Sequence, residues 1–166
     1  MWVKEYGFAK GICGWVAGAV AGLALSVGAA TADTGRGEVY VVKNDRGGVV
    51  GTRAAEIRRL KRKGKRVEIR GSICLSSCTM FLGAGNVCVS PETRFRFHSP
   101  SYYGRPLSRE NFDYWSGVIA AHYPVPLRRW FMREGRHRHN GYFTISGAEI
   151  IRLGVAQCPR RTALNG

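Results

Sequence analysis

The sequence predicts a single α/β domain, and three patterns in its first part support this prediction. A β-branched and aromatic run over 38–43 ends at a turn cluster over 44–48, as a strand followed by a loop does. Over 52–63, apolar residues recur at helical spacing among arginines and lysines, and Gly64 ends the run. A second short strand over 67–70 completes the order strand, helix, strand, which is typical of a parallel crossover unit.

The rest of the chain continues this alternation. Residues 71–85 begin with small and hydroxyl side chains and end in an apolar run, which predicts a turn that enters a buried helix. Short strands are expected over 87–90 and 94–98, on either side of Pro91. Further helices are expected over 108–123, 127–134 and 147–153. The sequence shows no internal repeat and no long linker, so the predicted domain covers residues 33–166.

The first 32 residues have the pattern of a cleavable secretory signal. Lys4 and Lys10 precede a stretch over 12–32 that has no charged residue and ends on Ala30-Thr31-Ala32. We therefore expect cleavage after Ala32 and a periplasmic or secreted domain. A retained membrane anchor is the alternative, because about 20 uncharged residues can span a bilayer. Six glycines among these 32 residues make the segment weakly hydrophobic for a permanent span.

The protein is strongly basic. It has 26 lysines and arginines against 11 acidic residues, and its formal net charge is +15. Because the first 32 residues contain two lysines and one glutamate, +14 remains on residues 33–166. Such a charge favours binding to anionic surfaces, such as lipid head groups or cell-envelope polymers. The basic run over 58–66 could neutralise phosphates, but such a run is usually the solvated face of a helix, so nucleic acid is not the expected partner.

Four cysteines follow the expected signal: Cys74, Cys78, Cys88 and Cys158. In an exported protein, an even number of cysteines predicts two disulfides, here with three alternative connectivities. A bond between Cys74 and Cys78 would close a small loop around Ser76, and Cys88 would then pair with Cys158. The small loop would hold the serine turn rigid, or the bond would simply stabilise a small exported domain.

No metal ion or other cofactor is expected. Zinc is an alternative to the disulfides, but Cys-x3-Cys followed by two isolated cysteines matches no common zinc spacing. A free thiol at Cys78 is a further alternative. His137 and His139 lie among arginines that repel cations, which indicates a solvated basic loop.

Ser76 and Ser77 lie where the buried helix is expected to begin. The first N–H groups of a helix have no partner inside the helix, so they can stabilise a developing oxyanion. Gly47 and Gly48 could supply further N–H donors, because glycine lets a loop approach a neighbouring strand end closely. A serine in this position is a candidate nucleophile, although a serine near a helix start more commonly serves as an N-cap.

Five short motifs occur along the chain in a characteristic order. They are Asp45-Arg46-Gly47-Gly48, Cys74-Leu75-Ser76-Ser77-Cys78-Thr79, Ala84-Gly85, Pro91 and Phe97-His98-Ser99-Pro100. Together they resemble the proteolytic subunit of Clp protease, in the Clp/crotonase superfamily, and in particular its exported bacterial relatives. The resemblance covers 39–100, and 144–155 is similar to the closing segment of the family.

The resemblance implies a fold and an activity. The fold would be a superhelix of repeated β-β-α units in a minimal single-domain form. The activity would be that of a serine hydrolase, specifically a peptidase, with a peptide or protein as its substrate. Because Clp-like sites often mature by assembly, the resemblance also implies a homo-oligomer.

The resemblance also assigns roles to residues of this chain. Ser76 would be the nucleophile, and His98 would be the base that takes its proton. The oxyanion donors would be the N–H groups of Gly47, Gly48 and Ser77.

The acidic member of the family's catalytic triad is missing from this sequence. The corresponding neighbourhood is Asn140-Gly141-Tyr142, and no aspartate follows Asp113. Asn140 is the candidate for the third position, because asparagine orients the base in papain-like sites, with less stabilisation of its charge. The missing acid and the basic charge support an alternative function, a non-catalytic protein of the same fold that binds an anionic partner in the cell envelope.

Overall fold

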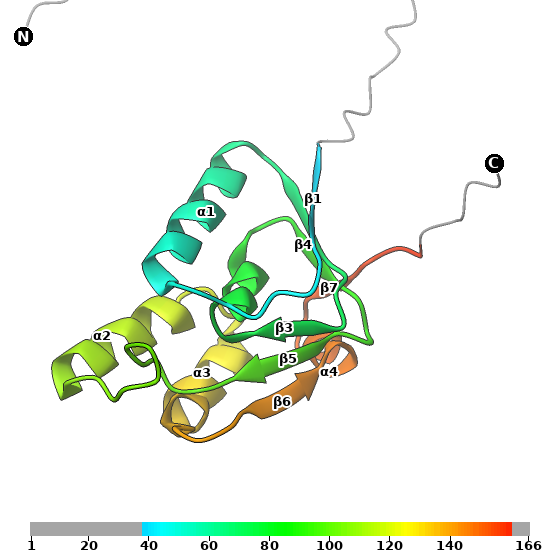
Figure 1. The fold of residues 1–166 in the computed structure, drawn as a ribbon. Coiled ribbons are helices and arrows are strands. Elements are labelled where there is room, and N and C mark those ends of the chain that lie inside the picture. Colours follow the sequence, from blue (N-terminus) through cyan, green and yellow to red (C-terminus); the bar gives the residue numbers. More distant parts are fainter. Residues whose placement is uncertain (1–37, 161–166) are drawn as a thin grey trace, which may run out of the picture. The chain divides into compact units, whose positions relative to one another are not determined.

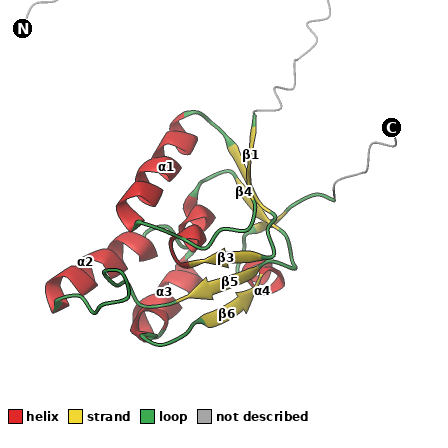
Figure 2. Ribbon diagram, in the orientation of Figure 1, coloured by secondary structure: helices red, strands yellow, loops and turns green. Residues whose placement is uncertain are grey.

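The computed structural model of the protein describes residues 38–160, which combine two small sheets with several helices (Figures 1 and 2). The α/β class predicted from the sequence is therefore confirmed. The signal expected over 1–32, or the membrane anchor that is its alternative, lies outside the described residues. Within 38–160, none of the helices has the length and apolar character needed to span a membrane.

The first sheet is entirely parallel. Its strands lie in the order β1 (Val39–Val42), β2 (Arg66–Ile69), β4 (Val87–Val89) and β7 (Ala156–Gln157). Helix α1 (Val50–Arg62) connects β1 to β2, and its buried residues are Ala54, Ile57 and Leu60. These three residues share one face because they are spaced three apart in a helix of 3.6 residues per turn. The predicted parallel crossover is confirmed.

The second sheet contains two strands that the sequence analysis did not identify. Strand β3 (Ile73–Leu75) pairs in parallel with β5 (Arg94–Phe97), and β5 pairs antiparallel with β6 (Phe143–Ser146). The three strands lie side by side in Figure 1. β3 is only three residues long, so it shows no periodicity of its own and is stabilised by pairing with a distant strand.

A buried 3₁₀ helix, η1 (Ser76–Gly83), follows β3. Its six residues over 77–82 are all buried, and none carries a charge. The sequence predicted a buried helix at this place, but the hydrogen-bond pattern is i to i+3 instead of i to i+4.

The remaining helices follow the predicted order with slightly different bounds. They are α2 (Arg109–Ala120), α3 (Val125–Arg133), a short 3₁₀ turn η2 (Gly135–His137) and α4 (Gly147–Arg152). The Ser108 side chain caps α2, and α4 begins with a capping box in which Ser146 and Glu149 bond each other's backbone N–H groups. Ile119, Leu127 and Phe131 join α2 and α3 to the core.

Both disulfides are present. Cys74 at β3 bonds Cys78 in η1, and Cys88 in β4 bonds Cys158, which follows β7. The second bond reinforces the β4–β7 pair, in which Cys88 lies opposite Ala156. The prediction of two disulfides is confirmed. The sequence had left three connectivities open, and the structure has the one that joins Cys74 to Cys78 and Cys88 to Cys158.

Candidate active site

Ser76 adopts an unusual backbone conformation at the junction between β3 and η1. Its φ is +59°, and within 38–160 the one other non-glycine residue with positive φ is Tyr103. A left-handed conformation costs a residue with a Cβ atom about 1–2 kcal/mol. The Cys74–Cys78 disulfide closes the loop in which this residue lies. The surrounding structure therefore maintains Ser76 in a strained turn, as is often seen at functional sites.

A chain of two hydrogen bonds supports this turn from the core. The Thr79 hydroxyl donates to the Ser76 carbonyl at 2.7 Å, so its oxygen accepts from the Tyr123 hydroxyl at 2.6 Å. Tyr123 is fully buried, and burial raises the pKa of its phenol, which therefore remains protonated and able to donate. No sequence signal links Tyr123 to the serine turn, because Tyr123 lies 44 residues after Thr79 in the chain.

The Gly47-Gly48 loop lies directly against the serine turn. Gly47 has φ +95°, and its N–H donates to the Asp45 carboxylate at 2.7 Å. The other oxygen of this carboxylate accepts from Arg53 at 2.6 Å. The Gly47 N–H is thus already occupied, which removes it from the three expected oxyanion donors.

Gly48 and Ser77 retain unpaired N–H groups. In the part of the chain that the structure describes, neither N–H makes a backbone or side-chain hydrogen bond. Gly48 lines the same cavity as Ser76. Ser77 is buried, and its N–H belongs to the first turn of η1, where the helix offers no internal acceptor.

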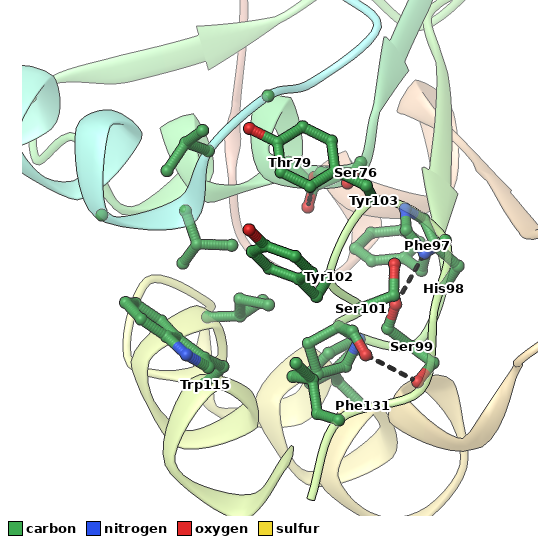
Figure 3. Close-up of a pocket in the computed structure, with 18 of the residues that line it drawn as sticks. Ser76, Thr79, Phe97, His98, Ser99, Ser101, Tyr102, Tyr103, Trp115 and Phe131 are labelled. Atoms are coloured by element: carbon green, nitrogen blue, oxygen red, sulfur yellow. Dashed lines mark hydrogen bonds between the residues drawn. The ribbon is translucent and has the colours of Figure 1, made fainter. Parts of the chain in front are cut away.

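His98 lies just beyond the end of β5 and lines this cavity as well. Its Nδ1 is 2.7 Å from the Ser99 carbonyl oxygen, so Nδ1 carries the proton and donates (Figure 3). The lone pair on Nε2 is then free to accept a proton. Burial lowers the pKa of His98, and the Ser99 carbonyl opposes this shift in part. The imidazole is therefore neutral at pH 7, as a general base must be.

Asn140 does not orient the imidazole through a hydrogen bond, as a triad member would. It is exposed and makes no hydrogen bond with His98, although both residues line a second cavity. The position expected for Asn140 at Nδ1 is taken by the Ser99 carbonyl. Sequence reasoning missed this acceptor because a backbone carbonyl has no residue-type signature.

The cavity that contains Ser76 and His98 has a volume of about 490 Å³. Within 38–160, Ser76 and His98 make no hydrogen bond with each other. In Figure 3, the 99–103 segment and Trp115 lie around the cavity. Its apolar walls come from Val49, Val50, Leu107, Trp115, Ile119 and Phe131.

Metal binding finds no support in the described range. Within 38–160, no group of three or more His, Cys, Asp or Glu side chains is arranged to hold a metal ion. All four cysteines in this range are used in disulfides.

The fold and the site together define an α/β protein that presents a strained serine and a neutral histidine to one apolar cavity. Comparison with models of protein families gave no match, and comparison with curated proteins gave none either.

Proposed function

We propose that the protein is an exported serine hydrolase, specifically a peptidase, with a Clp/crotonase-like fold. The observation that carries this proposal is the left-handed Ser76 at the mouth of a buried helix, on the same cavity as the neutral His98. The unpaired Gly48 N–H beside it supplies a donor for an oxyanion.

The order of strands supports the Clp/crotonase part of the proposal. Successive strands alternate between the two sheets: β2 and β4 belong to the first, and β3 and β5 to the second. A helix follows each pair, η1 after β3 and α2 after β5. This β-β-α order occurs twice, and we take it as support for the proposed crotonase-like superhelix.

The proposed mechanism uses the groups of the site that have a free donor or acceptor. Ser76 Oγ attacks the acyl carbon of a peptide bond while His98 Nε2 takes its proton. The N–H groups of Gly48 and Ser77 stabilise the oxyanion. The C–N bond then breaks, His98 returns the proton to the leaving amine, and water hydrolyses the acyl-enzyme by the same steps.

The Ser99 carbonyl replaces the usual carboxylate. It holds the Nδ1–H of His98 and so sets the tautomer, but it is neutral and stabilises the imidazolium less than an aspartate would. We therefore expect slower turnover than in a hydrolase with a complete acidic triad.

Labelling with a fluorophosphonate probe tests the proposal. We expect covalent labelling of the oxidised protein, none of Ser76→Ala, and at least a tenfold slower reaction of His98→Ala, because the base contributes roughly that factor or more. Ser90→Ala is the matched control, because Ser90 lies outside the cavity and should label like the wild type. Equal labelling of Ser76→Ala and the wild type, or no labelling of folded wild type, contradicts the proposal.

A second function is favoured by the charges of α1. Its outer face and the residue after it carry five exposed cations without an ion pair in the described residues: Arg58, Arg59, Lys61, Arg62 and Lys63. Such a face binds anionic lipid or envelope polymer without using the serine. Binding to anionic vesicles that weakens with salt and is unchanged in Ser76→Ala supports this function, and salt-insensitive binding contradicts it.

A further inference from the structure

His98 also lines a second cavity, which has a volume of about 770 Å³. The two cavities share the segment that follows the histidine, including Ser99, Ser101 and Leu107. Ser76 and Gly48 line the first cavity and do not line the second. The histidine therefore stands between the cavity of the nucleophile and a space that the nucleophile does not reach.

The second cavity is lined by basic side chains and by no acidic ones. Arg109, His137 and His139 line it, and no aspartate or glutamate does. Arg109 makes no ion pair with any residue within 38–160. The nearby carboxylate of Asp113 is already paired with Arg136 at 2.8 Å. The cavity therefore offers an uncompensated guanidinium to an anion.

The two histidines pack against the same aromatic ring. Both rings pack against Phe112, with centroids 5.6 Å away for His137 and 6.2 Å for His139. Arg136 Nε donates to His137 Nε2 at 3.3 Å, so the proton of this ring lies on Nδ1 and can be donated. The amide of Asn140 lines the same cavity and adds a further N–H donor.

We propose that this second cavity binds the free C-terminal carboxylate of a peptide substrate. The proposal rests on the proposed hydrolase function. In that reaction His98 gives its proton to the leaving amine, so the leaving group lies on the histidine side, away from Gly48. The leaving part of a peptide cut near its end carries the terminal carboxylate, and arginine is the residue best suited to bind it. The enzyme would then release short peptides or single residues from C-terminal ends.

A binding experiment tests this assignment without requiring turnover. The oxidised Ser76→Ala protein is titrated into a pool of fluorescein-labelled hexapeptides with Leu, Phe, Met or Tyr at the two central positions. The pool is made once with a free C-terminal carboxylate and once as the amide, and the dissociation constants are measured by fluorescence anisotropy. A third pool is an amide with glutamate as the penultimate residue.

We expect the acid pool to bind at least about fivefold more tightly than the amide pool at low salt, because one charge-assisted hydrogen bond is gained. Adding Arg109→Gln should reduce this ratio to within about twofold. Adding Arg62→Gln instead, which removes the same charge from an exposed arginine outside both cavities, should preserve the ratio. Melting temperatures establish whether the variants are folded. If the Arg109→Gln variant does not fold, the acid-to-amide ratio of the parent Ser76→Ala protein alone tests the proposal.

Equal affinity for the acid and amide pools overturns the assignment. So does an equal effect of Arg109→Gln and Arg62→Gln, because the charge would then act non-specifically. Binding of the glutamate amide as tight as that of the acid pool overturns the C-terminal assignment in favour of an acidic side chain. Failure of fluorophosphonate labelling would contradict the hydrolase function but would leave the carboxylate site untouched. The reason is that the acid-to-amide ratio is measured on a protein without the Ser76 hydroxyl.

Discussion

A Cβ atom placed on Gly47 would lie 2.7 Å from the Cβ of Ser76. It would also lie 2.8 Å from the Leu75 carbonyl oxygen. Both distances are shorter than non-bonded carbon and oxygen atoms allow, so the loop and the serine turn are in contact only because residue 47 has no side chain. The positions of the Gly47-Gly48 loop and of Ser76 are thus fixed together.

Gly47→Ala should therefore destabilise the protein by about 2 kcal/mol, through the overpacked contact and the unfavourable φ. It should also abolish labelling of Ser76, because the turn must move to relieve the contact. Urea unfolding and probe labelling measure the two effects. Gly48→Ala is the comparison, because a Cβ there meets no atom within 4 Å and only the φ of +147° opposes it. A greater loss of stability in Gly48→Ala than in Gly47→Ala would contradict this interpretation.

Replacing Ser76 should reveal the strain in its backbone. Ser76→Ala removes the hydroxyl and keeps the Cβ atom, whereas Ser76→Gly removes both. Because φ at this residue is +59°, we expect Ser76→Gly to be more stable than Ser76→Ala by about 1 kcal/mol, although glycine usually destabilises. Chemical denaturation of the two variants provides the measurement, and a more stable alanine variant would show that the turn is not strained.

Removing the Tyr123 hydroxyl should weaken the support of the serine turn. Tyr123→Phe deletes the donor to Thr79 in a fully buried position, so we expect a loss of about 1 kcal/mol in unfolding free energy. The Thr79 bond to the Ser76 carbonyl remains, so labelling should slow without disappearing. Tyr114→Phe is the control, because Tyr114 is exposed and should show neither effect.

The pH dependence of labelling should report the titration of His98. The base acts in its neutral form, so the labelling rate should rise with pH and reach half its maximum below 6.5, the usual histidine value, because burial lowers this pKa. Measuring the rate between pH 4 and 8 tests this, with His122→Gln as the control histidine variant. A midpoint above 6.5 would mean that a negative group acts on the imidazole.

The same shift predicts a change in stability. Between the lowered folded pKa and the unfolded value of 6.5, the unfolded chain binds more protons than the folded one. Stability should therefore fall as pH decreases through this window, and His98→Gln should reduce this dependence.

The two disulfides should contribute differently to stability and to the site. The Cys74–Cys78 bond spans 4 residues and the Cys88–Cys158 bond spans 70, so the chain-entropy model assigns them about 2 and about 4 kcal/mol. Replacing the first pair by alanine should nevertheless have the greater effect on Ser76 labelling, because that pair encloses the serine. Denaturant unfolding and labelling of the two double variants measure these effects, and equal labelling of both contradicts the positional role of the short loop.

Local patterns predicted the elements that carry their own signal. The helix over 50–62 has an apolar face and a glycine stop, and the β1–α1–β2 crossover follows from it. The four cysteines predicted the disulfides because an even set in a small chain that is expected to be exported has few other uses. The motif order also brought Ser76, Gly48 and His98 into consideration, and the structure places all three on one cavity.

Other features depend on strand pairing or on the exact backbone geometry, which no local sequence pattern encodes. Strand β3 is too short to be periodic and forms because β5 pairs with it. The Gly47 N–H was expected to be free, but the Asp45 side chain two residues earlier takes it. Asn140 was expected behind the imidazole, yet Nδ1 of His98 donates to the carbonyl of the adjacent Ser99.

The sequence alone therefore determined the α/β class, the oxidised cysteine set and the residue types available for acyl chemistry, because each of these depends on composition, periodicity or order along the chain. The tertiary structure decided the left-handed backbone of Ser76, the Thr79–Tyr123 support and the two cavities on either side of His98. These features arise from packing and hydrogen bonding between segments far apart in the chain, and such contacts exist only once it has folded.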